Sequence, residues 1–174
     1  MSIHETIESQ RKIIESQLDT YLEPYLETSI VQSMDDYIQH GQTSTLQHSL
    51  HVSYLSFSVA YVLHMHLNYE NLAVGALLHD FYLYDWHVEH PTGVVHGFSH
   101  SFTACYNALL YFHVNADVQQ IITCHMWPLN ITFLPRSKEA IIVCISDKLV
   151  TAVETIMGLW LFFYTLLFPD QKRG

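Results

Sequence analysis

The sequence predicts an all-α fold, organised as one helical bundle of about seven helices. The length of 174 residues is near the commonest size for a single domain. Apolar residues recur mostly at helical spacing, few runs alternate as strands do, and the six Gly and five Pro fall mostly between the helical patterns. With 49% apolar and 14% charged residues, the composition excludes a disordered chain. Because no repeat or low-complexity linker divides it, we expect residues 1–174 to form one domain.

Two N-terminal helices are expected within residues 2–40. Ser2 and Glu5 form a capping-box pattern, and isoleucines and a leucine follow them at helical spacing. Pro24 is expected to break or kink this first helix, because proline lacks a backbone N–H. A short second helix is expected over residues 29–39.

A third and a fourth helix are expected in the middle of the chain. Residues 43–45 (Thr-Ser-Thr) supply candidate N-caps for a helix that reaches about His66. Its apolar stripe consists of Val52, Leu55, Val59, Val62 and Leu63. The fourth helix is expected over residues 70–80. The stretch 82–98, rich in aromatic residues, His, Gly and Pro, is expected to form an ordered loop.

Three more helices are expected in the second half of the chain. Ser99 is the expected cap of a fifth helix that ends near His113, and Asp117 the expected cap of a sixth that ends near His125. The seventh helix is expected over residues 137–168, directly after a proline.

The end of the seventh helix, residues 156–168, is polar only at Thr165. These 13 residues are fewer than the ~20 that a membrane-spanning helix needs, so we expect no stable membrane insertion. They cover every face of a helix with apolar side chains, which predicts an exposed apolar patch and a homodimer that buries it. The expected dimer contacts are Trp160, Phe163 and Leu167. The alternatives are a central position under the N-terminal helices, and contact with a membrane surface.

Charge and cysteine content exclude some functional classes. Seven Lys and Arg against 17 Asp and Glu give a formal net charge of −10, which repels nucleic-acid polymers. The three Cys form no CxxC pair, which argues against a cysteine-based zinc module and fits a reduced compartment. The first residues lack the basic and apolar regions of a signal peptide, so we expect a cytoplasmic protein.

Several metal-type ligands interrupt otherwise apolar helices. His79 and Asp80 end the apolar fourth helix, and His48 lies in the first turn of the third. Asp147 lies inside the apolar seventh helix, and His125 ends the sixth. Each residue alone is more often structural than functional, but burying all of them would be costly unless they were paired or bound to metal. Neighbouring helical side chains diverge by about 100°, so His79 and Asp80 can converge only near a helix end.

The order of these residues resembles the HD-domain superfamily of metal-dependent phosphohydrolases. The resemblance rests on residues 45–52 (Thr-Leu-Gln-His-Ser-Leu-His-Val), 76–80 (Ala-Leu-Leu-His-Asp) and 145–149 (Ile-Ser-Asp-Lys-Leu). It implies an all-helical bundle with a central metal site and a metal-ligand core over residues 45–148. The implied mononuclear ligand set is His48, His79, Asp80 and Asp147.

Dinuclear branches of the superfamily have two further histidines, and the matching positions here are His100 and His125. His96, four residues before His100, could compete for that role or contact the substrate. His51 lies one turn after His48 and is a candidate ligand or phosphate contact. Most other histidines are expected to be ordinary surface or boundary residues: His4, His40, His64, His66 and His113. His87 and His90, in the loop, are candidate substrate contacts.

The implied reaction is attack of a metal-activated hydroxide on phosphorus, with His79 and the bridging Asp80 at the centre. Lys148 is a candidate phosphate contact, although consecutive helical residues face different ways. Trp86 and the aromatic residues around it could stack on a nucleobase or simply pack in the core. The expected cofactor is one or two divalent ions per chain (Fe, Mn, Zn or Co), with iron or manganese favoured.

Three functions remain open from the sequence. The first is hydrolysis of a phosphomonoester or phosphodiester of a small, nucleotide-like substrate. Cyclic dinucleotides are not implied, because the Lys after the His-Asp pair and the later Gly-Tyr-Pro signature of that branch are absent. The alternative is a mixed-valent di-iron oxygenase of the same fold that cleaves a carbon bond. The third is a catalytically silent metal-binding sensor, which ranks last because no ligand of the six is missing.

Overall fold

The computed structural model describes residues 3–88 and 95–167, and within them the side chains of residues 4–88 and 95–164. These residues form seven α-helices, one 3-10 turn and one short antiparallel strand pair, which confirms the predicted all-α class. The elements are α1 (Ile3–Leu26), α2 (Ser29–Gln32), η1 (Ser33–Asp36), β1 (Ile38–His40), β2 (Thr43–Ser44), α3 (Thr45–Val62), α4 (Tyr69–Leu78), α5 (His96–Phe112), α6 (Ala116–Cys124) and α7 (Lys138–Leu167).

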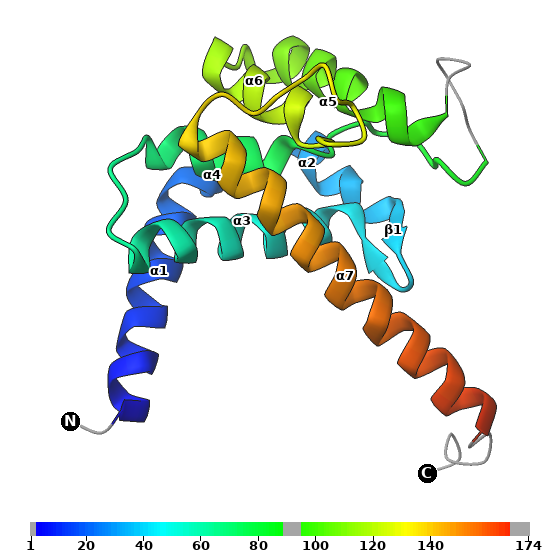
Figure 1. The fold of residues 1–174 in the computed structure, drawn as a ribbon, viewed down its shortest axis with the longest axis horizontal. Helices are drawn as coiled ribbons and strands as arrows, with labels where there is room; N and C mark the ends of the chain where they lie inside the picture. Colours follow the sequence, from blue (N-terminus) through cyan, green and yellow to red (C-terminus); the bar gives the residue numbers. More distant parts are fainter. Residues whose placement is uncertain (1–2, 89–94, 168–174) are drawn as a thin grey trace.

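The helices are stacked in layers around α4 (Figure 1). α3 packs along one side of α4, and α5 and α6 cover the opposite side. α1 packs on α3 and α4, and α7 crosses α3, α4 and α6. Every residue of α4 from Asn71 to Leu78 is buried, as expected for a helix that is apolar all round.

The crossing of α4 and α6 is close enough to require a glycine. A Cβ added at Gly75 would lie 2.8 Å from Cγ2 of Ile121, so a side chain there would push the two helices apart. One turn beyond this contact, α4 and α6 end at the C-cap residues His79 and His125. The close crossing therefore places two candidate ligands next to each other.

The start of α3 agrees with the prediction, but its apolar stripe does not. Ser44 is the N-cap and forms a capping box with Gln47. The helix ends at Val62 rather than near His66, and Val62 and Leu63 are 58% and 66% exposed. They are exposed because the chain leaves the helix there, with the next residue in the left-handed conformation.

The N-terminal region differs from the predicted helices in two ways. Pro24 does not break α1, which continues to Leu26, since a proline so near the C-terminal end disturbs little of the helix. Residues 29–39 do not form one helix: α2 stops at Gln32, η1 follows, and β1 pairs with β2. Gly41 has φ +61°, so it allows the turn of this hairpin.

Two predicted caps in the second half are wrong. α5 begins at His96, three residues before Ser99 and without a side-chain cap. Asn115, not Asp117, caps α6, because its side chain accepts hydrogen bonds from two backbone amides of the first turn. The end of α6 and the start of α7 agree with the sequence prediction. His90 and the rest of residues 89–94 lie outside the described residues.

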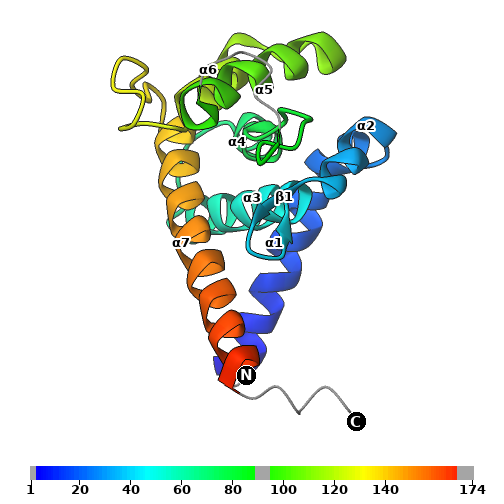
Figure 2. The same cartoon turned by 90° about the vertical axis from the view of Figure 1, so that its right-hand side faces the viewer.

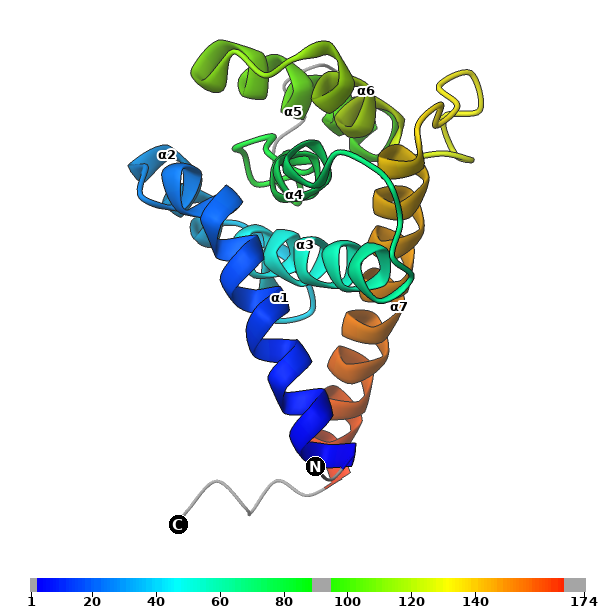
Figure 3. The same ribbon diagram turned by 90° about the vertical axis from the view of Figure 1, so that its left-hand side faces the viewer.

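The outer halves of α1 and α7 project from the same side of the body, as all three views show (Figures 1, 2 and 3). Figure 1 shows that the two helices spread apart as they leave the body. Ile156, Trp160 and Phe163 are 65%, 65% and 54% exposed. The expected alternative of a central, covered position for this run is therefore wrong. The side chain of Leu167 and all of Phe168 lie outside the described part. In the part described, no helix is long and apolar enough to cross a membrane.

We expect the exposed part of α7 to mediate a homodimer. Val153, Ile156, Trp160 and Phe163 follow one another at alternating spacings of three and four residues, the spacing of helix-pairing stripes. Light scattering of the full chain at micromolar concentration should give the mass of a dimer. Replacing both Trp160 and Phe163 by Glu should give a monomer, whereas Ile7→Glu on the projecting end of α1 should not. A wild-type monomer would contradict this prediction.

Candidate metal centre

The predicted ligands meet where several helices end or cross. His79 caps the C-terminal end of α4, and Asp80 follows it, so the two neighbouring side chains converge as the sequence predicts. His48 comes from the first turn of α3, and Asp147 comes from α7. Both members of the His-Asp pair are almost completely buried, at 0% and 1% exposure.

Three of the buried imidazoles have the same orientation. Nδ1 of His79, His100 and His125 each lies within hydrogen-bond distance of a backbone carbonyl oxygen in the preceding turn. The acceptors are the oxygens of Ala76 (2.7 Å), His96 (2.8 Å) and Ile122 (2.7 Å). Because a carbonyl oxygen can only accept, Nδ1 carries the proton in all three rings. In the neutral rings, Nε2 is therefore a free electron-pair donor.

The fourth imidazole is oriented by a carboxylate. Nδ1 of His48 lies 2.8 Å from Oε2 of Glu154, and Nδ1 of His51 lies 2.8 Å from Oε1 of the same residue. Glu154 thus joins a buried ring to one whose side chain is 61% exposed. Metal-ligating histidines commonly have this arrangement, in which a carboxylate binds one ring nitrogen and the other ring nitrogen faces the metal.

The four Nε2 atoms surround the carboxylate of Asp80. Its Oδ2 lies 3.3 Å from Nε2 of His79 and 3.8 Å from that of His48. Its Oδ1 lies 3.2 Å from Nε2 of His100 and 3.5 Å from that of His125. Each oxygen of one carboxylate therefore faces a different pair of histidines, which is the arrangement required of a bridging ligand.

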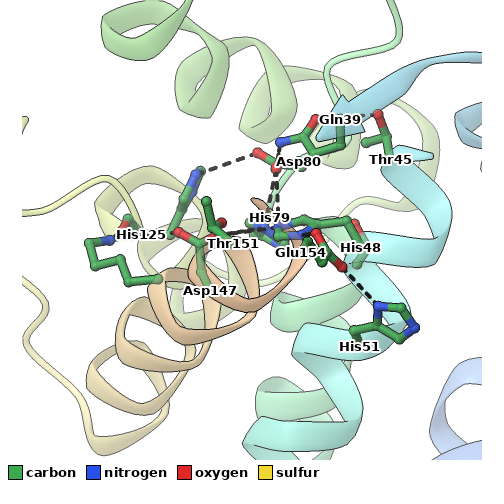
Figure 4. Close-up of polar contacts among 12 residues, drawn as sticks. Gln39, Thr45, His48, His51, His79, Asp80, His125, Asp147, Thr151 and Glu154 are labelled. Atoms are coloured by element: carbon green, nitrogen blue, oxygen red, sulfur yellow. Dashed lines mark hydrogen bonds and ion pairs between the residues drawn. The ribbon is translucent and has the colours of Figure 1, made fainter. Parts of the chain in front are cut away.

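A second carboxylate completes the cluster (Figure 4). Oδ1 of Asp147 lies 3.3 Å from Nε2 of His48 and 3.8 Å from that of His79. Two overlapping groups of ligand atoms result, each with all atoms within 4.8 Å of one another. The groups are His48, His79 and Asp147, and His79, Asp80 and His125.

The electron pairs of this cluster fit a bound cation. Nε2 of His79 is buried without a hydrogen-bond partner among the described residues. Nε2 of His100 lies 2.9 Å from Nε2 of His125. In neutral rings that carry their protons on Nδ1, these two electron pairs would repel each other at that distance. Borderline divalent cations bind imidazole and carboxylate donors, so the residues present suit such ions.

The ionisation states also favour a cation. For Asp80, burial raises the pKa, but His79 and His100 outweigh it and hold the pKa well below its usual range. Burial likewise raises the pKa of Asp147, and the hydrogen bond with His48 and the nearby histidines lower it further than burial raises it. Burial lowers the pKa of His125 to about 3, so this ring is neutral. The cluster thus presents two carboxylates and at least one neutral imidazole.

The carboxylates raise the pKa of two histidines of the cluster. Burial lowers the pKa of His48, but hydrogen bonds with Asp147 and Glu154 outweigh burial and raise the pKa to about 10. Burial also opposes protonation of His100, whose pKa is nevertheless raised by its hydrogen bond with Asp80. The carboxylates therefore favour positive charge at the centre of the cluster.

His96 lies outside both ligand groups. Its Nδ1 is 2.9 Å from the hydroxyl oxygen of Tyr84, and its ring stacks on His100 and on Trp86. Its backbone oxygen accepts the hydrogen bond of His100. Between the two competing residues, the geometry therefore places His100 at the cluster and His96 in the wall behind it.

Lys148 lies at the edge of the cluster. Its Nζ donates to the backbone oxygen of His125 at 2.7 Å and of Cys144 at 3.3 Å. It is also 3.6 Å from Oδ2 of Asp147. The ammonium group is therefore held beside the cluster rather than extended into solvent.

Sequence reasoning missed two polar residues beside the cluster. Gln39 donates from Nε2 to Oδ2 of Asp80 at 2.6 Å, and its Oε1 accepts from the hydroxyl of Tyr82. Its contact with Asp80 spans 41 residues, so no local pattern could reveal it. The second missed residue is Glu154, although it interrupts an apolar helix as Asp147 does. His40, expected to be a surface or boundary residue, is half-buried with its ring against that of His48.

We expect Glu154→Gln to weaken metal binding by about 10–100-fold, the usual cost of losing an outer partner of a ligating histidine. The amide can accept from one of the two histidines, but it lacks the charge that favours the required tautomer. Metal dissociation constants from calorimetry would measure the change, with circular dichroism as the check on folding. Glu8→Gln on α1, where the side chain is 47% exposed, is the matched control. Equal affinity in the variant and the wild-type chain would contradict this role.

The cluster is accessible through a cavity of about 1030 Å³, within the size range of small-molecule sites. Four predicted ligands line it: Asp80, His100, His125 and Asp147. Trp86, His87, His96 and Lys148 also line it, whereas His51 does not. Four of the candidate substrate contacts thus lie on the cavity wall, and His51 is outside it.

Comparison with known proteins identifies one family. A family model described as HD domain matches residues 45–152, more than half of the chain, and all six predicted ligands lie inside the match. Glu154 lies just beyond it. No curated protein and no solved structure matches the chain significantly.

Proposed function

The chain belongs to the HD domain family, and we propose that it is a metal-dependent phosphohydrolase that cleaves a phosphoester of a small molecule. The observation that carries the proposal is the position of Asp80, whose two oxygens face two different pairs of histidines. His48, His79 and Asp147 would hold one divalent ion and His100 and His125 a second, with Asp80 between them.

Bound divalent ions would supply a hydroxide nucleophile at neutral pH and positive charge for the phosphoryl oxygens. The chain's own residues prepare the site. Backbone carbonyls and Glu154 fix the histidine tautomers, and Gln39 orients the Asp80 carboxylate from outside. Lys148, fixed beside the mouth of the cluster, adds a positive charge for an incoming phosphoryl group. A set of imidazoles and carboxylates favours iron or manganese among the available metals.

The test is release of p-nitrophenol by the chain loaded separately with Mn, Fe, Zn or Co. p-Nitrophenyl phosphate and bis(p-nitrophenyl) phosphate serve as the monoester and diester, and Asp147→Asn serves as the impaired control. Metal-dependent hydrolysis of either ester that this variant loses supports the proposal. Oxygen consumption by the iron form without ester hydrolysis would overturn it in favour of the oxygenase. Tight metal retention without either activity would overturn it in favour of a sensor.

A further inference from the structure

The cavity beside the metal centre extends well beyond the predicted ligands. A second cavity of about 360 Å³ shares Gln39, His40, Trp86 and His87 with the first and continues along α7 to Gly158 and Leu159. The combined space runs from the ligand cluster towards the projecting half of α7. It can therefore receive a substrate body considerably larger than a phosphoryl group.

One wall of this space is a column of four nearly parallel rings. His87 stacks on Trp86 with an interplanar angle of 28°, Trp86 on His96 with 19°, and His96 on the ligand His100 with 16°. Because the rings stack face to face, their edges line the cavity. Nε1 of Trp86 is buried and has no hydrogen-bond partner in the described part of the chain, so this wall also contains an unused donor.

The remaining lining is mostly apolar and poor in positive charge. Five apolar residues line the first cavity: Val95, Met126, Pro128, Leu129 and Ala152. Lys148 is the one Lys or Arg lining either cavity in the part of the chain that the structure describes. Its ammonium group already donates to two backbone oxygens. Among the described residues, the wall thus has no second Lys or Arg that could neutralise another phosphoryl group.

From this lining we infer that the substrate carries one phosphoryl group on an uncharged, mostly apolar body. The phosphoryl group lies at the metal centre, and the body lies between the ring column and Leu129. The position of the phosphoryl group rests on the proposed function. The uncharged, apolar character of the rest of the substrate is inferred from the cavity wall alone. Leu129 is 49% exposed, so it can be changed with little effect on the core.

Binding of non-hydrolysable phosphonates to the Mn-loaded full chain tests this inference without requiring turnover. Calorimetry would compare 2-naphthylmethylphosphonate with methylphosphonate, which share the headgroup and differ in the body. The naphthyl compound should bind roughly tenfold tighter or more, because it buries a bicyclic apolar surface. A carboxylate added at the far end of the naphthyl ring should remove most of that gain.

Leu129→Glu should abolish the preference for the naphthyl body and leave methylphosphonate binding within about twofold of wild type. Leu134→Glu is the matched control, because Leu134 lies in the same loop but lines a different cavity. Equal binding of the two phosphonates by the wild-type chain would overturn the inference, as would equal weakening of both by Leu129→Glu. A preference for the naphthyl compound without hydrolysis of any phosphoester would refute the proposed reaction but support the inferred substrate body. Hydrolysis of a phosphoester without a preference for the naphthyl compound would support the proposed reaction and refute the inferred substrate body.

Discussion

Replacing Asp80 by alanine is expected to remove bound metal and hydrolytic activity together. Asp80 is 1% exposed, and its carboxylate is the one group that faces all four ligand histidines. Its loss takes a ligand from both proposed ions at once. The metal affinity should therefore fall by more than the ~10–100-fold typical of changes outside the direct ligands.

Metal content per chain after purification without chelator would measure this loss, with ester hydrolysis recorded on the same samples. His113→Asn is a suitable control, because His113 is exposed and has φ 51°, a conformation that asparagine tolerates. Circular dichroism would show whether Asp80→Ala keeps the helical content. Full metal occupancy in a folded Asp80→Ala chain would refute the site assignment.

The ligand set could be predicted because each member breaks a strong local pattern. Asp147 interrupts an apolar helix, and His79 and Asp80 follow a helix that is buried on every face. A polar or charged group in such a position is costly without a partner, so the sequence alone indicates that partners exist. The common burial of these ligands in one cluster agrees with that reasoning.

The surroundings of the ligands could not be predicted, because they depend on contacts between distant segments. Gln39 reaches Asp80 only because residues 38–44 form a hairpin, and a short strand pair leaves little periodic signal. His40 lies in the same strand pair, so its contact with His48 could not be predicted either. Glu154 did interrupt an apolar run, but its position opposite His48 depends on where α7 crosses α3.

The mistaken helix caps have a different cause. Ser99 and Asp117 are good N-cap residue types, yet α5 starts earlier and Asn115 lies two residues before Asp117. Several capping residues close together leave the first turn ambiguous, and tertiary contacts select one of them. Asn115 also donates from Nδ2 to Oδ1 of Asn71 on α4, which fixes it as the boundary.

Replacing either His100 or His125 by alanine is expected to lower the metal content from two ions per chain towards one. Both rings face Oδ1 of Asp80, whereas Oδ2 faces His48 and His79, which form a ligand group with Asp147. The remaining group keeps three ligands and the Oδ2 atom, enough for one ion. The two single variants and the double variant should therefore have the same content, because each destroys the same site.

His96→Phe separates this assignment from its competitor. Phenylalanine keeps a flat ring between Trp86 and His100, and the backbone oxygen that accepts from Nδ1 of His100 is unchanged. The variant should therefore retain two ions per chain, although it loses the contact with the hydroxyl of Tyr84. Loss of one ion in His96→Phe, with full content in His100→Ala, would reverse the roles of the two residues. Wild-type content in both His100→Ala and His125→Ala would show instead that these rings bind no second ion and only line the wall of a mononuclear site.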